Sequence, residues 1–359
     1  MERGEKGERP LVSGHVSWFA DIALSDRADV GGKGGSLGEL QRAGVAVPPG
    51  FVVRTAAFDH FIAALERIAP VRMPVAALDP HDLDAITACS NALRCRIEQA
   101  ALPQDVAEEI TSAHAALCAG APEAAVAVRS SATTEDAGDA SFAGLQDTYL
   151  WIKGADQVLG MVRSCWASLY SVESITYRRS RGFQEHDVAM AVVVQTMIDA
   201  RAAGVMFTRS PVTGDRSVIA IEGAWGLGSS VVGGEVTPDR WVIGKITGEI
   251  SVREISDKTI QHLPAPTGGV DTVPVAEELR RAASMSDDEL QALRDVARRI
   301  ERHYGCAQDI EWAVDRRSGE ILILQSRPET VWSARDGTPA ARAADDPISH
   351  VLWIFGGRR

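Results

Sequence analysis

The stretch VRSSAT at residues 128–133, with DIEW at 309–312 and LQSRPET at 324–330, carries the strongest signal in this sequence. The first stretch ends an apolar run with one cation and three hydroxyl groups. The other two place carboxylates, an amide and a guanidinium on what we expect to be neighbouring short strands. Mg²⁺ prefers hard oxygen ligands, and the fork of an arginine matches phosphate oxygens. Together the three stretches predict a site for a polyphosphate and its metal ions.

The last two stretches are predicted to form a hairpin across the turn RSG at 317–319. Because side chains alternate between the two faces of a strand, Asp309 and Glu311 share one face. By the same spacing, Gln325 and Arg327 share one face of the second strand. Apolar residues occupy the positions in between and would bury the opposite face. We expect the four polar groups to converge on one cavity; the alternative is a pair of solvated strand faces.

Composition indicates a large globular protein and argues against two classes of partner. With 359 residues, of which 45% are hydrophobic and 24% charged, the chain can bury a large core in two or three packed subdomains. A formal net charge of −12 speaks against nucleic acid, because binding a polyanion draws on clustered positive charge. The longest apolar run, residues 188–194, is too short to span a bilayer, and no signal peptide is recognisable. We therefore expect a cytoplasmic protein that binds neither nucleic acid nor membrane.

Hydrophobic periodicity predicts a chain that mixes helices and strands. Helices are expected at 33–43, in two or three amphipathic pieces between 55 and 119, as a pair over 155–181, and at 287–304 with Ser286 as N-cap and Gly305 as stop. Strands are expected near 125–128, 148–152, 188–198, 204–208, 217–221, 240–243, 250–253, 309–314 and 321–325.

These motifs resemble the N-terminal nucleotide-binding part of the pyruvate phosphate dikinase, phosphoenolpyruvate synthase and rifampicin phosphotransferase family, a variant of the ATP-grasp fold. The resemblance implies an α+β fold of two lobes that hold ATP and Mg²⁺ in the cleft between them. The N-terminal lobe would span 15–198, with the phosphate loops and supporting helices. The C-terminal lobe would span 199–333, with the hairpin for the metal and phosphoryl transfer. Residues 1–14 are expected to be a disordered leader and 334–359 a linker or tail.

Two cations are candidates for contact with the nucleotide phosphates. Lys33 lies in GGKGGS at 31–36, interpreted as a flexible loop that leads into a helix. Glycines let backbone N–H groups approach an anion, and a helix N-terminus is electropositive. The resemblance implies that Lys33 and Arg129 both contact the phosphates. The alternative for Arg129 is a surface ion pair with Glu135 or Asp136.

The segment SFAGLQDT at 141–148 resembles the mobile loop that covers the phosphates in this family. Gly144 and backbone N–H groups would close over the nucleotide, and Thr148 would end the loop at the start of a strand. An ordinary turn is the alternative. Closure of this loop is expected to gate the reaction.

The segment QTMI at 195–198 resembles the part of the family that holds adenine. The amide of Gln195 and the backbone as far as Ile198 can read the edge of the purine, while Met197 packs on its face. A core methionine with a satisfied glutamine would give the same pattern.

On the predicted hairpin, the resemblance implies that Glu311 and Gln325 are the metal ligands. Asp309 is a further acidic group of the site, and Arg327 would stabilise the phosphoryl group in transfer. The long motifs at 204–214 and 222–228 are interpreted as chiefly architectural. Glu222 and Arg209 are their second-tier polar candidates.

Enzymes of this family pass phosphate to a histidine on a swivelling domain, and no histidine of this sequence lies in the Gly-Gly, Thr/Ser-His setting of that domain. We therefore expect the ATP-binding half of a dikinase-like phosphotransferase, with the histidine domain on a separate chain. A stand-alone kinase that phosphorylates a small molecule is the second hypothesis. A nucleotide-sensing module without turnover is the third. The acceptor and the choice between AMP and ADP as product stay open at this point.

Overall fold

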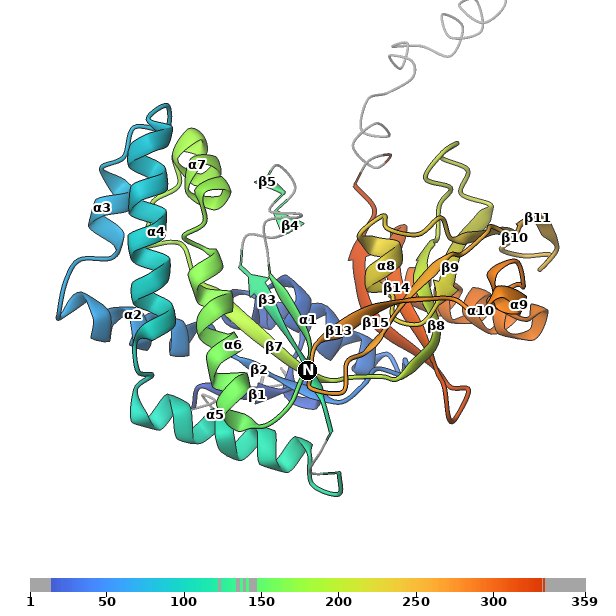
Figure 1. The fold of residues 1–359 in the computed structure, drawn as a ribbon. Helices are drawn as coiled ribbons and strands as arrows, with labels where there is room; N and C mark the ends of the chain where they lie inside the picture. Colours follow the sequence, from blue (N-terminus) through green and yellow to red (C-terminus); the bar gives the residue numbers. More distant parts are fainter. Residues whose placement is uncertain are drawn as a thin grey trace, which may run out of the picture.

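The computed structural model describes residues 14–121, 124–133, 136–137, 140–141, 147–330 and 332 (Figure 1). The predicted leader, apart from residue 14, and the predicted tail at 334–359 lie outside these residues. So does the central part of the predicted phosphate-covering loop, including Gly144. Among the described residues, no helix is both long and apolar enough to cross a membrane.

The first sheet of the described chain is antiparallel and has the strand order β1-β2-β7-β3-β6. Its strands are β1 (Val16–Trp18), β2 (Gly50–Val53), β7 (Met190–Thr196), β3 (Val126–Ala132) and β6 (Thr148–Ile152). Phe51 and Val194 face each other in register and pack into one hydrophobic cluster. The neighbouring pair Val52 and Val193 packs into another cluster on the opposite face. The central strands read as unbroken apolar runs because both faces of this sheet are buried.

Helices cover the two faces of the first sheet. Helix α1 (Arg27–Arg42), which follows the short 3₁₀ turns η1 (Phe19–Asp21) and η2 (Leu24–Asp26), covers one face through Leu37. The other face packs against Phe58, Phe61 and Trp166. The helices on that side and around it are α2 (Thr55–Glu66), α3 (Arg72–Ala76), α4 (Leu83–Gln99), α5 (Gln104–Leu117), α6 (Ala155–Ser168) and α7 (Val172–Arg181).

The sequence predictions for these helices have a mixed outcome. The pair over 155–181 is confirmed as α6 and α7. Between residues 55 and 119, which the structure describes throughout, there are four helices rather than two or three. The extra helix is α3, a single turn of five residues that is too short to show a periodic pattern.

The stretch at 31–36 was predicted to be a flexible loop that leads into a helix, but only Gly31 is non-helical: it separates two helical segments of α1, and residues 32–36 belong to the second. Within α1, Gly31 alone departs from helical geometry, with φ of 70° and ψ of 177°, and it kinks the helix. A Cβ at Gly31 would lie 2.1 Å from the carbonyl oxygen of Ser131 on β3. The glycine is therefore required by a left-handed φ and by close packing, and not by flexibility.

The second sheet of the described residues is also antiparallel, in the order β11-β10-β9-β8-β14-β15. Its strands are β8 (Ala200–Phe207), β9 (Val218–Trp225), β10 (Asp239–Gly244), β11 (Ile250–Glu254), β14 (Gln308–Asp315) and β15 (Ile321–Pro328). Helix α10 (Asp287–Tyr304) packs its apolar side on one face, where Leu290 and Leu293 join the cluster of Ile310 and Trp312. The opposite face carries Glu222 and Glu311 together with a smaller apolar cluster that includes Ala203 and Ala313.

The predicted strands all overlap strands of the structure, and the helix at 287–304 is confirmed with both of its ends. The N-cap Ser286 forms a capping box with Glu289, and Gly305 follows the helix with φ of 70°. Several short elements were not predicted: β1, β2, α8 (Ser229–Val232), α9 (Glu277–Arg280), the hairpin β12 (Ile260–Pro264) with β13 (Val270–Pro274), and the pair β4 (Asp136–Ala137) and β5 (Ala140–Ser141). The α+β class is confirmed.

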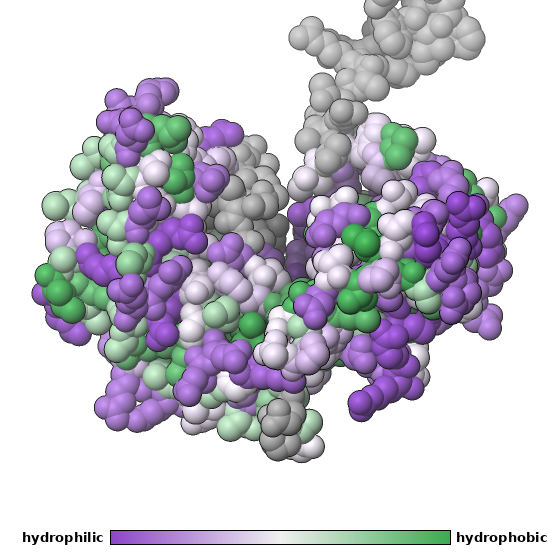
Figure 2. All heavy atoms as spheres, viewed as in Figure 1, coloured by the Kyte–Doolittle hydropathy of each residue, from purple (hydrophilic) through white to green (hydrophobic). Residues whose placement is uncertain are grey.

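The two sheets form two halves that meet along α1 (Figure 1). Leu37 of α1 packs with the first sheet, and Leu40 packs with the second. The hydroxyl of Ser36 donates a 2.6 Å hydrogen bond to the carbonyl oxygen of Ser326 on β15. Figure 2 shows the two halves separated by a hollow in the upper middle of the view. The arrangement places the polar face of the second sheet opposite the end of the first sheet.

Candidate active site

A cavity of about 370 Å³ lies where the two sheets meet. Strands β3, β6 and β7 contribute from the first sheet, and β8, β14, β15 and the segment around α8 contribute from the second. Most of its lining is apolar, and its two charged members, Arg129 and Glu311, are hydrogen-bonded to each other and define what we call its polar end. Its size and its lining are those of a small-molecule site between two structural units.

Arg129 links the two sheets at the polar end of the cavity. Its guanidinium donates a 3.1 Å hydrogen bond to Glu311 Oε2 and a 2.5 Å hydrogen bond to Gln325 Oε1. A third hydrogen bond of 3.0 Å goes to the carbonyl oxygen of Leu324. Arg129 belongs to β3 and is 8% exposed, whereas all three acceptors belong to β14 and β15. One buried cation therefore binds the carboxylate and the amide that the sequence pairs as metal ligands.

The register of β14 and β15 brings the four predicted hairpin residues together in two cross-strand pairs. Glu311 lies opposite Gln325, and Asp309 lies opposite Arg327, with an irregularity in the ladder just after Glu311. Arg327 Nε is 3.4 Å from Asp309 Oδ2. Of these four side chains, the cavity wall itself includes Glu311. The others extend the polar surface beyond that end of the cavity.

Asp309 is the carboxylate with the most unusual electrostatic setting in the described part of the site. Burial raises its pKa to about 6, and the charge of Glu329 adds to the rise, while Arg327 opposes it. Its Oδ1 atom is buried and has no hydrogen-bond partner among the described residues. A carboxyl group with such a pKa exchanges its proton near neutral pH, which suits a group that takes part in proton transfer.

Lys33 does not line the cavity but lies on α1 just after the kink at Gly31. Both Lys33 and Asp147 influence the pKa of the buried Cys165 thiol, which burial raises strongly; Lys33 lowers this pKa and Asp147 raises it. Asp147, the other charge near this thiol, directly precedes Thr148 of the cavity wall. This stretch of α1 is held by a 3.2 Å hydrogen bond from the backbone N–H of Gly34 to the hydroxyl of Ser131.

The predicted adenine segment forms the apolar end of the cavity. Gln195, Met197 and Ile198 all belong to its wall. The amide of Gln195 donates a 3.2 Å hydrogen bond to the carbonyl oxygen of Pro48, and the side chain is 3% exposed. Part of the hydrogen-bonding capacity that we assigned to the purine is therefore engaged by the protein. Met197 and Ile198 pack against the cluster that contains Ala203.

Comparison with known proteins identifies the architecture. The family described as pyruvate phosphate dikinase, AMP/ATP-binding domain, matches residues 27–346. The chain belongs to this family. Membership makes it a nucleotide-binding domain and confirms the family resemblance inferred from the motifs.

Curated relatives of this AMP/ATP-binding domain carry the name phosphoenolpyruvate synthase. The probable enzyme of Methanocaldococcus jannaschii is 40% identical over 343 residues, which are 95% of this chain and 28% of that protein. The probable enzyme of Methanothermobacter thermautotrophicus is 42% identical over 318 residues, or 88% of this chain and 46% of the relative. The phosphoenolpyruvate synthase of Pyrococcus furiosus is 37% identical over 355 residues, or 88% and 44%. The chain spans less than half the length of these relatives.

Among solved structures, the ADP complex of N5-carboxyaminoimidazole ribonucleotide synthetase aligns with 70% of this chain and 58% of its own. The sequence identity is 11% and the TM-score is 0.25. A likeness at this level supports no argument about the site.

The motifs interpreted as architectural supply part of the cavity wall of this AMP/ATP-binding domain. Gly204, Leu227, Gly228 and Ser229 all line it, and sequence reasoning assigned none of them to the site. The hydroxyl of Ser229 is 2.8 Å from Nδ1 of His262, which fixes the wall from behind. The signal that was available is the run GLGSS at 226–230, in which small residues leave room for a ligand.

Glu222 and Arg209, the two lower-ranked polar candidates of the AMP/ATP-binding domain, lie in different surroundings. Glu222 and Glu311 both lie opposite Val205 of β8, from the strands on its two sides, so they share one face of the sheet. Arg209 is 7% exposed, donates a 2.8 Å hydrogen bond to the carbonyl oxygen of Gly214 and stacks on the ring of Trp332. Glu222 thus faces the site, whereas the contacts of Arg209 hold its own loop.

Proposed function

We propose that this chain is the ATP-dependent half of a dikinase-like phosphotransferase. It binds ATP and Mg²⁺ in the cavity between the sheets and transfers a phosphoryl group to a histidine on a domain outside these 359 residues. The observation that carries the proposal is the cluster of Arg129, Glu311 and Gln325 at the polar end of a largely apolar cavity. A nucleotide has a flat, largely apolar base and a charged triphosphate, so its site needs both kinds of lining. Phosphoryl transfer would take place at the polar end of the cavity.

The polar end suits a hydrated divalent cation and a triphosphate. The oxygens of Glu311 and Gln325 converge on one cationic group, at 3.1 and 2.5 Å, so this position favours positive charge. Mg²⁺ is typically held by one or two carboxylates together with substrate phosphates and water, and it neutralises charge on the phosphate oxygens. Glu311 and Gln325 would hold the ion. Gln325 would contribute a neutral oxygen beside the carboxylate.

The remaining groups have roles that follow from their charge and place. Lys33 and Arg129 would bind phosphate oxygens, and Arg327 would stabilise the charge of the phosphoryl group in transfer. Asp309, held beside Arg327, would accept or release a proton there. Met197 and Ile198 would pack on the adenine, with the amide of Gln195 near its edge. Thr148 and the loop around Gly144 would lie over the phosphates.

The proposal is tested by identifying the phosphorus-containing products of the reaction. The purified chain is incubated with Mg-ATP, with and without histidine-domain proteins from the same source, and the products are identified by ³¹P NMR. AMP that appears only with a histidine-domain protein supports the dikinase-like reaction. ADP together with a phosphorylated small molecule would instead indicate a direct kinase. Binding without turnover under every condition would leave a nucleotide-sensing module.

Nucleotide binding can be tested separately by thermal unfolding. Mg-ATP at about 100 times its Kd should add about 2.7 kcal/mol to the free energy of unfolding. GTP at the same concentration should stabilise less, because its base presents a different edge to Gln195 and the backbone. Equal shifts for ATP and GTP would contradict the assignment of residues 195–198 to adenine.

A further inference from the structure

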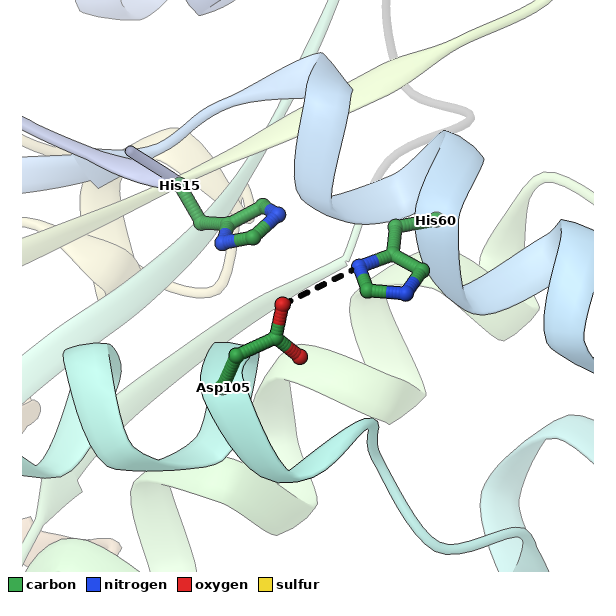
Figure 3. A group of neighbouring side chains, drawn as sticks. All are labelled: His15, His60 and Asp105. Carbon is green, nitrogen blue, oxygen red and sulfur yellow. Dashed lines mark ion pairs between the residues drawn. The ribbon is translucent and has the colours of Figure 1, made fainter. Parts of the chain in front are cut away.

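A cluster of three metal-ligating side chains lies outside the candidate active site, on the helical side of the first sheet (Figure 3). His15 directly precedes β1, His60 lies on α2, and Asp105 lies in the first turn of α5. One potential ligand atom from each residue lies within 4.8 Å of the other two. Three elements that are far apart in the sequence thus bring two imidazole nitrogens and one carboxylate oxygen close together.

The spacing of these atoms is close to that of a zinc site. His60 Nδ1 and Asp105 Oδ2 are 3.5 Å apart. Zinc bonds of about 2.0–2.2 Å in a tetrahedron place two ligand atoms roughly 3.4 Å from each other. Two of the three ligands therefore have nearly the required separation, and the His15 nitrogen lies within 4.8 Å of both. The side chains of His60 and Asp105 are 39% and 54% exposed, so they have room to adjust.

A fourth residue, Glu109, prepares His15 for this role. Its carboxylate lies 2.9 Å from Nδ1 of His15 and accepts a 2.6 Å hydrogen bond from the backbone N–H of the same residue. A carboxylate that holds Nδ1–H leaves the lone pair of Nε2 for an ion, which is the arrangement found behind histidine ligands of metals. Figure 3 shows one ring nitrogen of His15 directed toward His60.

The surroundings favour a cation. The shallow groove beside the cluster is lined by Asp105, Glu108 and Glu109, three carboxylates that share one face of the N-terminal part of α5. The rings of His15 and His60 stack with their centroids 5.5 Å apart. The nitrogen lone pairs lie in the ring planes, so an ion bound by these nitrogens would lie at the edge of the stack and neutralise part of the negative potential.

We propose that His15, His60 and Asp105 bind one divalent transition-metal ion of the zinc class, with Glu109 as the carboxylate that orients His15. Imidazole nitrogens select Zn²⁺, Co²⁺ or Ni²⁺ over Mg²⁺, which requires oxygen ligands. The site is therefore distinct in chemistry from the polar end of the cavity. Three protein ligands leave a fourth tetrahedral position for water.

The ion would fasten an otherwise weakly held strand. β1 has three residues and forms three register pairs with β2 along the edge of the sheet. A bond from His15 to the ion would tie this edge strand to α2 and α5 at once. Because the three elements come together only in the folded chain, the ion should stabilise it against unfolding.

The test uses the full chain without an affinity tag, in buffer that contains excess Mg²⁺. Co²⁺ is added as a spectroscopic probe, and Zn²⁺ is then used to displace it. We expect one Co²⁺ per chain, absorption bands of a nitrogen- and oxygen-ligated ion, full displacement by Zn²⁺, and a rise in melting temperature with either ion. His60→Gln should weaken Co²⁺ binding by at least about tenfold, and Glu109→Gln should weaken it by about 10–100-fold.

His186→Gln is the matched control, because the side chain of His186 is 74% exposed and lies outside the cluster. It should bind Co²⁺ as the unchanged chain does. Asp105→Asn is the second cluster variant, and the melting temperature of each metal-free variant shows whether it folds. Unchanged Co²⁺ affinity in both cluster variants would overturn the proposal. A thiolate absorption band would also overturn it, since the exposed Cys95 and Cys306 would then be the ligands.

Discussion

The two sheets of this domain are covered in different ways, and the difference locates the chemistry. In the first sheet, Phe51 and Val52 are neighbours in sequence yet both fully buried, one in each hydrophobic cluster. In the second sheet, Trp312 is fully buried against α10, whereas its neighbour Glu311 faces the cavity. The first sheet holds few buried polar side chains, among them Arg129 and Gln195, whereas the second sheet and the segment around α8 supply most of the cavity wall.

This comparison separates changes that should affect the reaction from changes that should affect the fold. Glu311 lines the cavity, and the other polar residues on its face of β14 and β15 lie outside the hydrophobic cluster of the second sheet, so their replacement should lower turnover and spare stability. Arg129 is the exception, because it belongs to the first sheet but its hydrogen bonds end on the second. Its replacement should lower both.

The largest effect is expected for Glu311→Gln. The amide keeps the size of the side chain and a hydrogen bond from Arg129, but it removes the charge proposed to hold Mg²⁺. Turnover of ATP should fall by at least about 100-fold, or about 2.7 kcal/mol in the barrier, while the melting temperature stays nearly unchanged. Steady-state rates and thermal unfolding on one preparation measure both quantities.

The control for this change is Glu320→Gln, at the exposed turn of the same hairpin. It removes the same charge from the same pair of strands, and its turnover should stay within about twofold of the unchanged chain. If Glu311→Gln retains full turnover, Glu311 is not a metal ligand. If Glu311→Gln unfolds, the polar face of the second sheet supports the fold, and the contrast between the sheets fails.

The second effect is expected for Arg129→Lys, which keeps the charge but loses the fork that reaches three acceptors. Turnover should fall about 30-fold, or about 2 kcal/mol. Lysine cannot reach all three acceptors, and each lost hydrogen bond costs about 0.5–1.5 kcal/mol, so we expect a loss of about 1–2 kcal/mol of stability. Urea unfolding measures this loss.

The control for Arg129 is Arg316→Lys, whose guanidinium pairs with Asp199 while both side chains are about two-fifths exposed, at 42% and 39%. An exposed pair contributes at most about 1 kcal/mol. Equal losses of stability in the two variants would mean that Arg129 does not join the sheets more strongly than a surface contact.

The third effect is the pH dependence of the unfolding free energy, measured in the chain without metal and nucleotide. It compares Asp309 and Asp315, which lie toward the two ends of β14. Burial raises the pKa of Asp309 to about 6 from 3.8, so the folded state retains a proton that the unfolded state has already lost. Asp309 is therefore most favourable for stability below about pH 4, and this contribution is lost as the pH rises toward 6. A shift of one to two units corresponds to about 1.4–2.7 kcal/mol. The difference in unfolding free energy between the unchanged chain and Asp309→Asn should fall over this range and be level above pH 7.

Asp315, at the other end of the same strand, should behave in the opposite way. Hydrogen bonds from the backbone N–H groups of Ser318 and Arg317 lower the pKa of its carboxyl below 3.8. Its contribution is present above its unfolded pKa and is lost as the pH falls through the lower, folded value. The difference in unfolding free energy between the unchanged chain and Asp315→Asn should therefore rise with pH, and it should do so at lower pH than the fall expected for Asp309. Slopes of the same sign would contradict the view that Asp309 is buried and Asp315 solvated.

Local signals in the sequence were sufficient for some elements. Helix α10 is confirmed at both ends because its start and stop are decided by neighbours in the chain, the capping box of Ser286 with Glu289 and the left-handed Gly305. The two strands of the hairpin follow from their apolar pattern and the turn between them, so the hairpin itself was predictable from local sequence. Its register at the site was not, because a regular ladder counted from the turn would place Leu324 opposite Glu311, and the irregularity after Glu311 places Gln325 there instead.

Elements decided by distant contacts were not predictable in the same way. The glycines of α1 suggested a loop because glycine is a poor helix former, yet Gly31 approaches β3 and a Cβ at Gly38 would lie 2.6 Å from Cβ of Ile22. The wall formed by residues 227–233 was missed because the sheet that brings it to the cavity is assembled from strands far apart in the sequence. The roles proposed for Lys33, Arg129 and the hairpin residues stay predictions until the variants are measured.

The smallest effect is expected at the apolar end of the cavity, for Met197→Ala. Met197 packs beside Ala203 in the wall, and the loss of its side chain removes a contact with adenine while the phosphate groups keep theirs. Kd for ATP should rise about 3–10-fold, or about 0.6–1.4 kcal/mol, and the maximal rate should change little, because the polar groups of the second sheet are untouched.

The control is Met161→Ala on α6, which packs against the core of the first sheet. That change should lower the melting temperature and leave Kd as it is. A lower maximal rate with unchanged Kd in Met197→Ala would place this side chain near the transferred phosphoryl group, and the separation into an apolar binding end and a polar reacting end would then be wrong.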